Sequence, residues 1–124
     1  MLFDLRHNSF VTLFKINPGR RLPPHFHAMP VVGYVLQGVW KYEEHDWVAR
    51  PGSMVYEPAG EVHTLVNIGR KPMISVFHVT GPHLDVDEQG HVLNYVDAYS
   101  ALTYTRDYCK MRGIDDSFIA KITR

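Results

Sequence analysis

The sequence predicts an all-β fold, from short strand-like segments, the turns that separate them and their aromatic and β-branched composition. Between residues 9 and 80, runs rich in Val, Tyr, Phe and Trp are separated by Gly and Pro. Strands at this spacing favour an antiparallel barrel or sandwich over alternating strands and helices. With 124 residues and 45% hydrophobic content, we expect one domain over 1–124, with a barrel at about 9–96 and a helical tail at about 97–124.

Six segments are expected to form the barrel strands. Residues 9–16 alternate loosely and end at an Asn-Pro-Gly turn, and residues 30–36 form an almost continuous apolar run that stops before Gly38. Residues 39–43 alternate, with Trp40 and Tyr42 on one face. Segments 53–57, 63–66 and 73–79 complete the series, each preceded by a stretch that contains Gly or Pro.

The last third of the chain predicts a hairpin followed by helices. Residues 85–95 are expected to form a hairpin that turns at 87–90. Asp97 is a plausible N-cap and Gly113 a plausible C-cap of one helix, and Asp115 or Asp116 could cap a last short helix. Helices in this position usually cover an open end or an edge of a barrel.

Composition and charge exclude several classes of function. The formal net charge of +0 provides no electrostatic footprint for nucleic acid, so none is expected as a partner. The single Cys109 cannot form an intrachain disulfide. The N-terminus does not resemble a signal peptide, and no apolar run is long enough to span a bilayer. We therefore expect a soluble cytoplasmic protein without a membrane partner.

Three of the eight histidines predict a metal site. His25 and His27 lie one residue apart, and on a β-strand alternate side chains point to the same face. His63 follows a Pro-Ala-Gly turn and can bring a third imidazole from a neighbouring strand. Three ligands of this kind hold a divalent metal and leave coordination positions open for chemistry.

The spacing of these residues resembles both signature motifs of the cupin superfamily. Gly19 is followed after five residues by His25, then His27, and later by Gly38; Gly52 is followed after five residues by Pro58-Ala59-Gly60, His63 and Asn67. The resemblance implies a small double-stranded β-barrel, similar to a jelly roll, with the metal inside. One position departs from the pattern, since Val31 stands where cupins usually carry a glutamate ligand. Three neutral histidines leave the metal its full charge and favour anionic bidentate ligands such as an enolate.

Segments 38–47 and 57–66 look like a particular cupin group, which contains 2,4'-dihydroxyacetophenone dioxygenase and, more distantly, an acetylacetone-cleaving dioxygenase. The resemblance implies a three-histidine Fe(II) centre that splits a carbon–carbon bond beside a carbonyl and inserts both atoms of O2. It also implies a small carbonyl substrate, such as a β-diketone, an α-hydroxyketone or a hydroxyacetophenone. The number and type of ligands do not by themselves select iron, because three imidazoles also bind Zn, Ni, Mn or Cu.

Glu57 is the candidate catalytic residue beside the metal. It shares a strand face with Val55 and could point into the barrel, where a carboxylate can bond a ligand histidine, a water or the substrate. The alternative is an exposed residue at a strand end. The candidate pocket residues are mostly aromatic, although aromatics on barrel strands also serve as plain core: Val31, Tyr34, Trp40, Tyr42, Phe77 and His78.

Two other functions use the same histidines. A zinc-binding sensor, like the barrel domain of certain anti-sigma factors, would bind metal without turnover. A metal-dependent isomerase or lyase would act on a small sugar or keto acid, although such pockets usually favour Lys, Arg and Glu. For all three functions a homodimer is expected, because a small barrel has sheet edges to cover.

Overall fold

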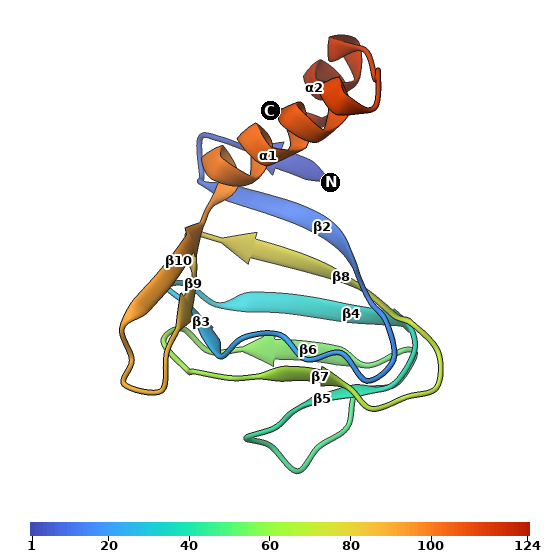
Figure 1. Ribbon diagram of the computed structural model, residues 1–124, viewed down its shortest axis with the longest axis vertical. Helices are drawn as coiled ribbons and strands as arrows, with labels where there is room; N and C mark the ends of the chain where they lie inside the picture. The colour runs from blue at the N-terminus through green and yellow to red at the C-terminus, as the bar shows by residue number, and fades with distance from the viewer.

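The computed structural model describes residues 1–124 and contains ten strands and two helices (Figure 1). The strands are β1 (Leu2–Asp4), β2 (Ser9–Ile16), β3 (His25–His27), β4 (Val31–Gln37), β5 (Trp40–Tyr42), β6 (Met54–Glu57), β7 (Leu65–Asn67), β8 (Met73–Thr80), β9 (His83–Val86) and β10 (Val92–Val96). The helices are α1 (Ala98–Met111) and α2 (Asp116–Ile122).

Two layers of antiparallel strands form the barrel. One layer is a five-stranded sheet in the order β1-β2-β8-β4-β6. The other contains β10-β9-β3 and the pair β5-β7. His25 and His63 join these two parts by exchanging backbone hydrogen bonds of 3.0 and 2.8 Å. The predicted all-β barrel is therefore confirmed, and the strand that carries two of the candidate ligands lies in the middle of the second layer.

Strict alternation along β4 shows why these sequences form strands around a core. Val31 and Val35 are buried, whereas the side chains of Val32 and Tyr34 face outward. Gly33 lies on the inner face, and a Cβ placed there would lie 2.6 Å from a ring carbon of Phe77 on β8. The absence of a side chain at Gly33 thus lets the Phe77 ring cross the interior directly against the β4 backbone.

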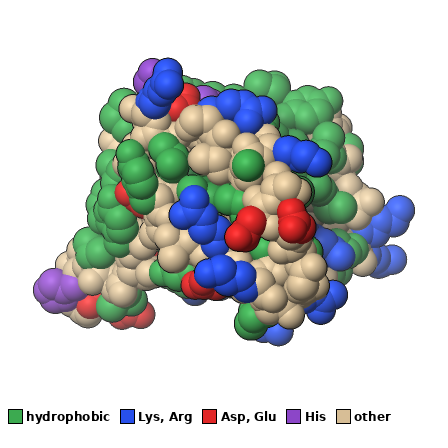
Figure 2. Space-filling view, turned by 90° about the horizontal axis from the view of Figure 1, so that it is seen from above, with side chains coloured by type: hydrophobic (Ala, Val, Ile, Leu, Met, Phe, Trp, Pro, Cys, Tyr) green, Lys and Arg blue, Asp and Glu red, His purple; other side chains and the backbone are tan.

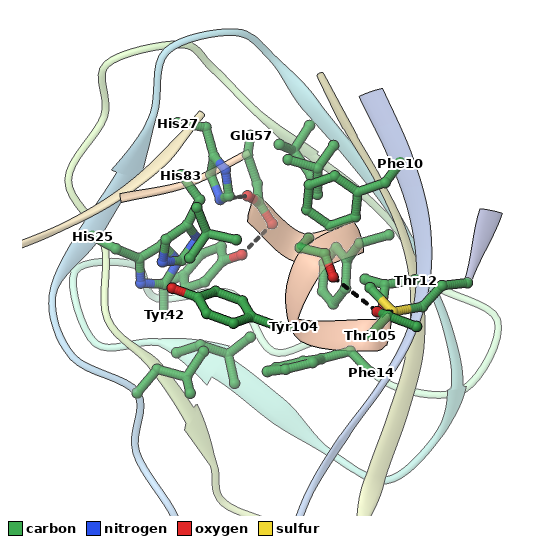
Figure 3. Close-up of a pocket in the computed structure, with 18 of the residues that line it drawn as sticks. Phe10, Thr12, Phe14, His25, His27, Tyr42, Glu57, His83, Tyr104 and Thr105 are labelled. Atoms are coloured by element: carbon green, nitrogen blue, oxygen red, sulfur yellow. Dashed lines mark hydrogen bonds and ion pairs between the residues drawn. The ribbon is translucent and has the colours of Figure 1, made fainter. Parts of the chain in front are cut away.

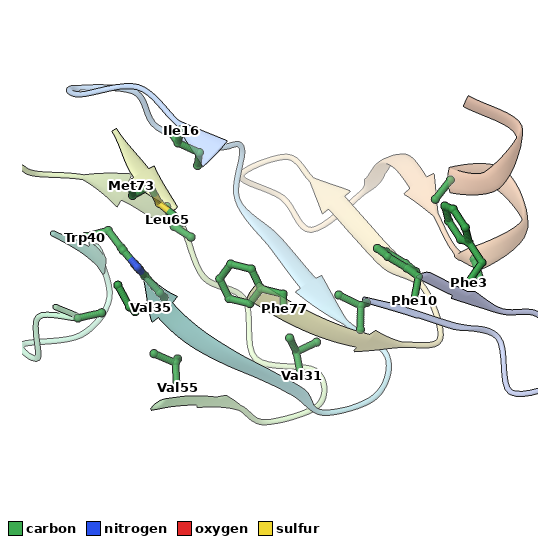
Figure 4. Close-up of a cluster of buried hydrophobic side chains, with 14 of the residues drawn as sticks. Phe3, Phe10, Ile16, Val31, Val35, Trp40, Val55, Leu65, Met73 and Phe77 are labelled. Atoms are coloured by element: carbon green, nitrogen blue, oxygen red, sulfur yellow. The ribbon is translucent and has the colours of Figure 1, made fainter. Parts of the chain in front are cut away.

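The hydrophobic core runs along the barrel, from Trp40 and Met73 at one end to Phe10 and Phe3 at the other (Figure 4). Trp40 is fully buried, and its indole N–H donates to Ser75 Oγ at 3.2 Å. Its ring packs against Tyr42 and Phe77 at centroid distances of 5.4 and 6.0 Å. At the other end, Phe3 and Phe10 pack together near the helices.

Most strands lie close to their predicted positions. The observed β2 has the predicted bounds, and β4, β5, β6 and β8 differ from prediction by one residue at one or both ends. The hairpin differs more, because β9 begins at His83 rather than at residue 85. His63 lies just before β7 and pairs with His25 as an isolated bridge rather than within a strand.

The C-terminal helices follow the predicted caps. Asp97 caps α1: its side chain accepts from Ser100 N–H while the Ser100 hydroxyl oxygen accepts from the Asp97 N–H. Gly113 follows the end of α1 with a φ of 65°, a left-handed conformation that glycine adopts readily. Asp115 caps α2. Neither helix has the length and apolar character needed to cross a membrane.

Helix α1 lies against the β1–β2 side of the barrel and is tied there by polar contacts (Figure 1). The Tyr99 hydroxyl donates to the Leu5 carbonyl at 2.7 Å, and Asn8 Oδ1 accepts from the Ala98 N–H at 3.1 Å. The chain ends meet beside it, since Arg124 N–H donates to the Phe3 carbonyl at 2.7 Å. Seen from above relative to Figure 1, acidic and basic side chains lie among one another on the surface (Figure 2).

Candidate metal centre and substrate pocket

Three buried histidines converge inside the barrel. His25 and His27 point inward from β3, and His63 reaches the same place from the bridge before β7. Their residues are only 4%, 5% and 1% exposed. One ring nitrogen from each lies within 4.8 Å of the others. The alternation of a His-x-His strand thus produces the cluster that the sequence predicts.

One of these rings is oriented by a hydrogen bond, and another makes none within the protein. His25 Nδ1 donates to the Pro23 carbonyl at 2.9 Å, which leaves its Nε2 as the free lone pair. Both ring nitrogens of His63 are buried and have no hydrogen-bond partner. A buried ring nitrogen without a partner destabilises the folded protein, unless a bound group interacts with that nitrogen. A divalent metal fits this donor set, because three neutral imidazoles are a common ligand set for such ions.

Glu57 brings a carboxylate to the same point. It is 2% exposed, and its Oε2 lies 3.1 Å from His27 Nε2 and 3.5 Å from His63 Nε2. The Tyr42 hydroxyl donates to its other oxygen, Oε1. In the sheet, Glu57 lies directly opposite Val31. A carboxylate therefore enters the centre from β6, beside the β4 position where cupins usually carry a ligand glutamate.

Burial and neighbouring groups set the protonation states of the centre. Burial lowers the pKa of His25 to about 4 and also lowers the pKa of His63, so both rings are neutral near pH 7. Burial acts to raise the pKa of Glu57, but hydrogen bonds with His27 and Tyr42 outweigh it and the net pKa is lowered. Burial and the nearby Glu57 carboxylate raise the pKa of Tyr42, which keeps its proton. The result is two neutral imidazoles, those of His25 and His63, beside an ionised carboxylate.

His83 and Asp85 adjoin the triad, and our sequence reasoning missed them. In the β3–β9 register, His83 lies opposite His27 and Asp85 opposite His25. The His83 ring stacks on His25 at a centroid distance of 4.4 Å, and its Nε2 lies 2.8 Å from Asp85 Oδ1. Burial lowers the pKa of His83. The His-x-Asp alternation at 83–85 is a second inward-facing pair, obscured because the hairpin was predicted to begin at residue 85.

A cavity of about 540 Å³ opens from the histidines toward α1 (Figure 3). Its polar end contains His25, His27, Glu57, His83 and Tyr42. Thirteen of its nineteen lining residues are hydrophobic, and none is Lys or Arg. The site therefore combines a compact polar end with a long apolar chamber, an arrangement typical of pockets for small apolar ligands with one polar group.

Half of the predicted pocket residues line this cavity and half do not. Val31, Tyr42 and Phe77 contribute to its wall. Trp40 does not, because its ring is packed into the core beyond Tyr42. Tyr34 and His78 were also wrong as pocket residues: both are exposed on the outer face of the five-stranded sheet. Each directly neighbours an inward position, Gly33 or Phe77, and alternation turns it away from the interior.

Other parts of the wall come from segments that were not predicted to approach the site. Phe10 and Phe14 of β2 lie on one side of the cavity. Tyr104 and Tyr108 of α1 lie at its helical end, one helical turn apart. The aromatic residues on α1 were visible in the sequence, but the placement of the helix over the barrel opening depends on tertiary contacts.

Comparison with known proteins supports the fold and the family. No functionally curated protein matches this chain. An RmlC-like cupin protein from Ralstonia eutropha JMP134 is 33% identical, with a TM-score of 0.87 over 92% of this chain and 74% of that one. An acetylacetone dioxygenase from Acinetobacter johnsonii is 19% identical, with a TM-score of 0.70 over 77% of this chain and 66% of that one.

The anti-sigma factor ChrR of Rhodobacter sphaeroides, in complex with SigE, is also similar. Its identity is 22% and its TM-score 0.52, over 57% of this chain and 38% of that one. At these low identities, the dioxygenase and the anti-sigma factor show a shared fold only. The model of the ChrR cupin-like domain matches residues 1–83, which include all three candidate ligands. This protein is therefore a member of the ChrR cupin-like domain family.

Proposed function

We propose that this protein is a three-histidine non-haem Fe(II) dioxygenase that cleaves a carbon–carbon bond next to a carbonyl. The substrate would be a β-diketone, an α-hydroxyketone or a hydroxyacetophenone. The observation that carries the proposal is the convergence of three imidazoles and one carboxylate at the end of an apolar cavity of about 540 Å³. This combination provides both a metal site and a largely apolar cavity for an uncharged organic substrate.

The metal would be held by His25, His27 and His63. Bound Fe(II) would supply a Lewis acid for the substrate oxygens and a site at which O2 can react. The choice of iron rests on the resemblance to the dioxygenase group, since Zn, Ni, Mn and Cu also bind imidazole. The Pro23 carbonyl fixes the tautomer and direction of His25, so that its Nε2 is available as a ligand.

Glu57 is proposed to hold the proton that the substrate loses. Its carboxylate is ionised, buried and adjacent to the ligand nitrogens, so it can accept a proton from the carbon next to a carbonyl. The Tyr42 hydroxyl, which bonds Oε1, holds the carboxylate in one orientation and leaves Oε2 facing the histidines. Tyr42 thus acts by positioning Glu57.

The apolar chamber is proposed to exclude water and to receive the hydrocarbon part of the substrate. Phe10, Phe14 and Phe77 supply aromatic surface along its length. Without Lys or Arg in the wall, a phosphate or a second carboxylate would find no counter-charge. This argues against the isomerase alternative for phosphorylated or acidic sugars.

The second candidate function is a metal-binding sensor. Membership of the ChrR cupin-like family favours it, because ChrR itself is an anti-sigma factor. A sensor needs the same histidines but does not consume O2 when a substrate is added. Oxygen consumption therefore separates the two candidates.

We further propose that the protein acts in the cytoplasm as a homodimer. The outer face of the five-stranded sheet supports a dimer, because it exposes large apolar side chains from three strands. They are Leu13 of β2, Val32, Tyr34 and Leu36 of β4, and Met54 and Tyr56 of β6.

The deciding experiment is oxygen uptake by protein reconstituted anaerobically with Fe(II). It uses a panel of β-diketones, α-hydroxyketones and hydroxyacetophenones, with product analysis by mass spectrometry. We expect substrate-dependent uptake and two cleavage products, at least one of them a carboxylic acid, that each carry one atom of ¹⁸O2. A protein that holds stoichiometric iron but consumes no oxygen with any of these compounds would overturn the proposal in favour of the sensor.

A further inference from the structure

A second polar pair lies beside the metal centre and has no part in the function proposed above. His83 and Asp85 are inward-facing residues of β9, opposite His27 and His25 of β3. Because alternate residues of a strand share a face, both pairs point into the same space. His83 lines the cavity and stacks on His25, so it is adjacent to any ligand of the metal centre (Figure 3).

The hydrogen bonds of this pair determine which nitrogen of His83 carries a proton. His83 Nε2 lies 2.8 Å from Asp85 Oδ1, and a carboxylate oxygen can only accept. The Nε2 of the neutral ring is therefore the donor, and Nδ1 carries the lone pair. Asp85 is itself held, because Asn94 Nδ2 donates to its Oδ2 at 3.0 Å. His83 Nδ1 makes no hydrogen bond within the protein and is not among the enclosed unpaired atoms.

Glu57, Tyr42 and His83 thus leave acceptors rather than donors free at the polar end of the cavity. Glu57 is a carboxylate, and the only proton of the Tyr42 hydroxyl is already donated to it. No Lys or Arg lines the wall. A ligand that brings a hydroxyl hydrogen would satisfy His83 Nδ1, whereas an oxygen with lone pairs alone would face it unfavourably.

We propose that His83 binds substrate by accepting a hydrogen bond from a hydroxyl on the carbon next to the carbonyl, with Asp85 as the positioning residue. This inference rests on the proposed function and narrows its substrate to α-hydroxyketones. A chelated β-diketonate has two acceptor oxygens at its head and nothing to donate to His83. An α-hydroxyketone has the required donor one bond from the carbonyl carbon.

The first test measures the tautomer of His83 by ¹⁵N NMR of Zn(II)-loaded protein with labelled histidine. In the unaltered protein, Nε2 should show the shift of a protonated nitrogen and Nδ1 that of a free lone pair. Asp85→Asn should invert the two signals. The carbonyl of the new amide accepts from Asn94, so its NH2 group faces His83 and donates to Nε2. The double variant Asp85→Asn, Asn94→Asp reverses the amide and should restore the original tautomer.

The second test measures binding of a matched pair of compounds to the same Zn(II)-loaded proteins by calorimetry. 2-Hydroxyacetophenone has the donor, and its methyl ether, 2-methoxyacetophenone, lacks it. We expect the dissociation constant of the hydroxyketone to be lower than that of the methyl ether by a factor on the order of 2 to 10, which corresponds to the contribution of one hydrogen bond. Asp85→Asn should abolish this preference and the double variant should restore it. Asp87→Asn is the matched control, because that exposed carboxylate also pairs with a histidine, His91, but outside the cavity.

Two results would overturn the inference. One is a His83 tautomer with the proton on Nδ1 in the unaltered protein. The other is an unchanged preference between the two compounds in Asp85→Asn. Either can occur while Fe(II)-loaded protein consumes oxygen with β-diketones, in which case the proposed function stands and the assignment of His83 falls. Conversely, the protein could prefer the hydroxyketone in a way that depends on the His83 tautomer and yet consume no oxygen. That result would support His83 as a binding residue and contradict the proposed dioxygenase function.

Discussion

At the level of single residues, the pairing of Val31 with Glu57 shows that the candidate metal centre contains a carboxylate after all. Val31 occupies the β4 position at which cupins usually carry a ligand glutamate, and Glu57 faces it from β6. The carboxylate thus reaches the same part of the barrel from a neighbouring strand. The Glu57 carboxylate lies 3.1 Å from His27 Nε2, so the negative charge that the sequence motif lacks is in contact with the three histidines.

Replacement of a ligand tests the centre directly. His63→Ala removes a nitrogen donor that is fully enclosed, and the affinity for Fe(II) or Zn(II) should fall by more than ~100-fold, beyond the loss typical of an outer partner. Metal content after dialysis, measured by mass spectrometry, reports the effect. His78→Ala is the matched control, because His78 is exposed on the outer sheet face. Stoichiometric metal retained by His63→Ala would contradict the assignment.

Glu57 should affect turnover more than metal retention. Glu57→Gln preserves the shape and a hydrogen bond to Tyr42 but removes the proton acceptor, and turnover should fall by roughly 10²- to 10⁴-fold. Steady-state oxygen uptake at saturating iron measures this loss, and metal content is measured in parallel. Wild-type turnover in a Glu57→Gln protein would show that the carboxylate takes no part in proton transfer.

At the level of elements, the N-cap of α1 supports one wall of the cavity. Asp97 begins the helix that carries Tyr104 and Tyr108. Burial acts to raise the pKa of Asp97, but hydrogen bonds from Ser100 and Tyr95 outweigh burial and lower the pKa overall. A carboxyl whose folded pKa is depressed contributes stability above its unfolded pKa of 3.8. That contribution is lost as the pH falls through the lower folded pKa.

Asp97→Ala should therefore cost about 1 kcal/mol of unfolding free energy at pH 7, the usual worth of an N-cap. The difference between the variant and wild type should shrink as the pH is lowered below about 4, since the wild-type cap becomes protonated. Urea unfolding at a series of pH values measures both quantities. Asp107→Ala on the same helix, at an exposed position, is the control. A cost that does not vary with pH would exclude the ionised cap.

The close contact between β4 and β8 gives a second prediction at this scale. Gly33→Ala places a methyl group 2.6 Å from the Phe77 ring, so the variant should lose about 1–3 kcal/mol through overpacking. The double variant with Phe77→Leu removes the ring edge and should recover part of the loss. Thermal unfolding of the single and double variants measures the coupling. Additive effects of the two substitutions would contradict this account of Gly33.

At the level of the whole molecule, the apolar outer sheet face predicts a homodimer. Tyr56 is 65% exposed there, and Tyr56→Glu places a charge in the expected interface. Sedimentation should show a dimer for wild type and a dissociation constant raised by at least ~10-fold for the variant. Leu93→Glu, at an equally exposed position on β10, serves as the control. A monomeric wild type, or a dimer unaffected by Tyr56→Glu, would exclude this face.

Strand alternation explains both the successes and the errors in the predicted site. His25 and His27 were predictable because a His-x-His strand must aim both rings to one side. The same rule excludes Tyr34, once Val31 is placed inside, and excludes His78, once Phe77 is inside. Trp40 does face inward, but whether an inward ring lines a cavity or packs in the core depends on what fills the space beside it.

The sequence by itself determined where most strands lie along the chain, the three metal-binding candidates and the caps of the helices, because alternation, motif spacing and capping act over a few neighbouring residues. Tertiary structure alone decided which distant residues meet. The pairing of β4 with β6 brings Glu57 opposite Val31, and the pairing of β3 with β9 brings His83 and Asp85 to the triad. Which distant strands pair and where α1 docks depend on packing of the whole core, a sum of long-range contacts that a local pattern does not encode.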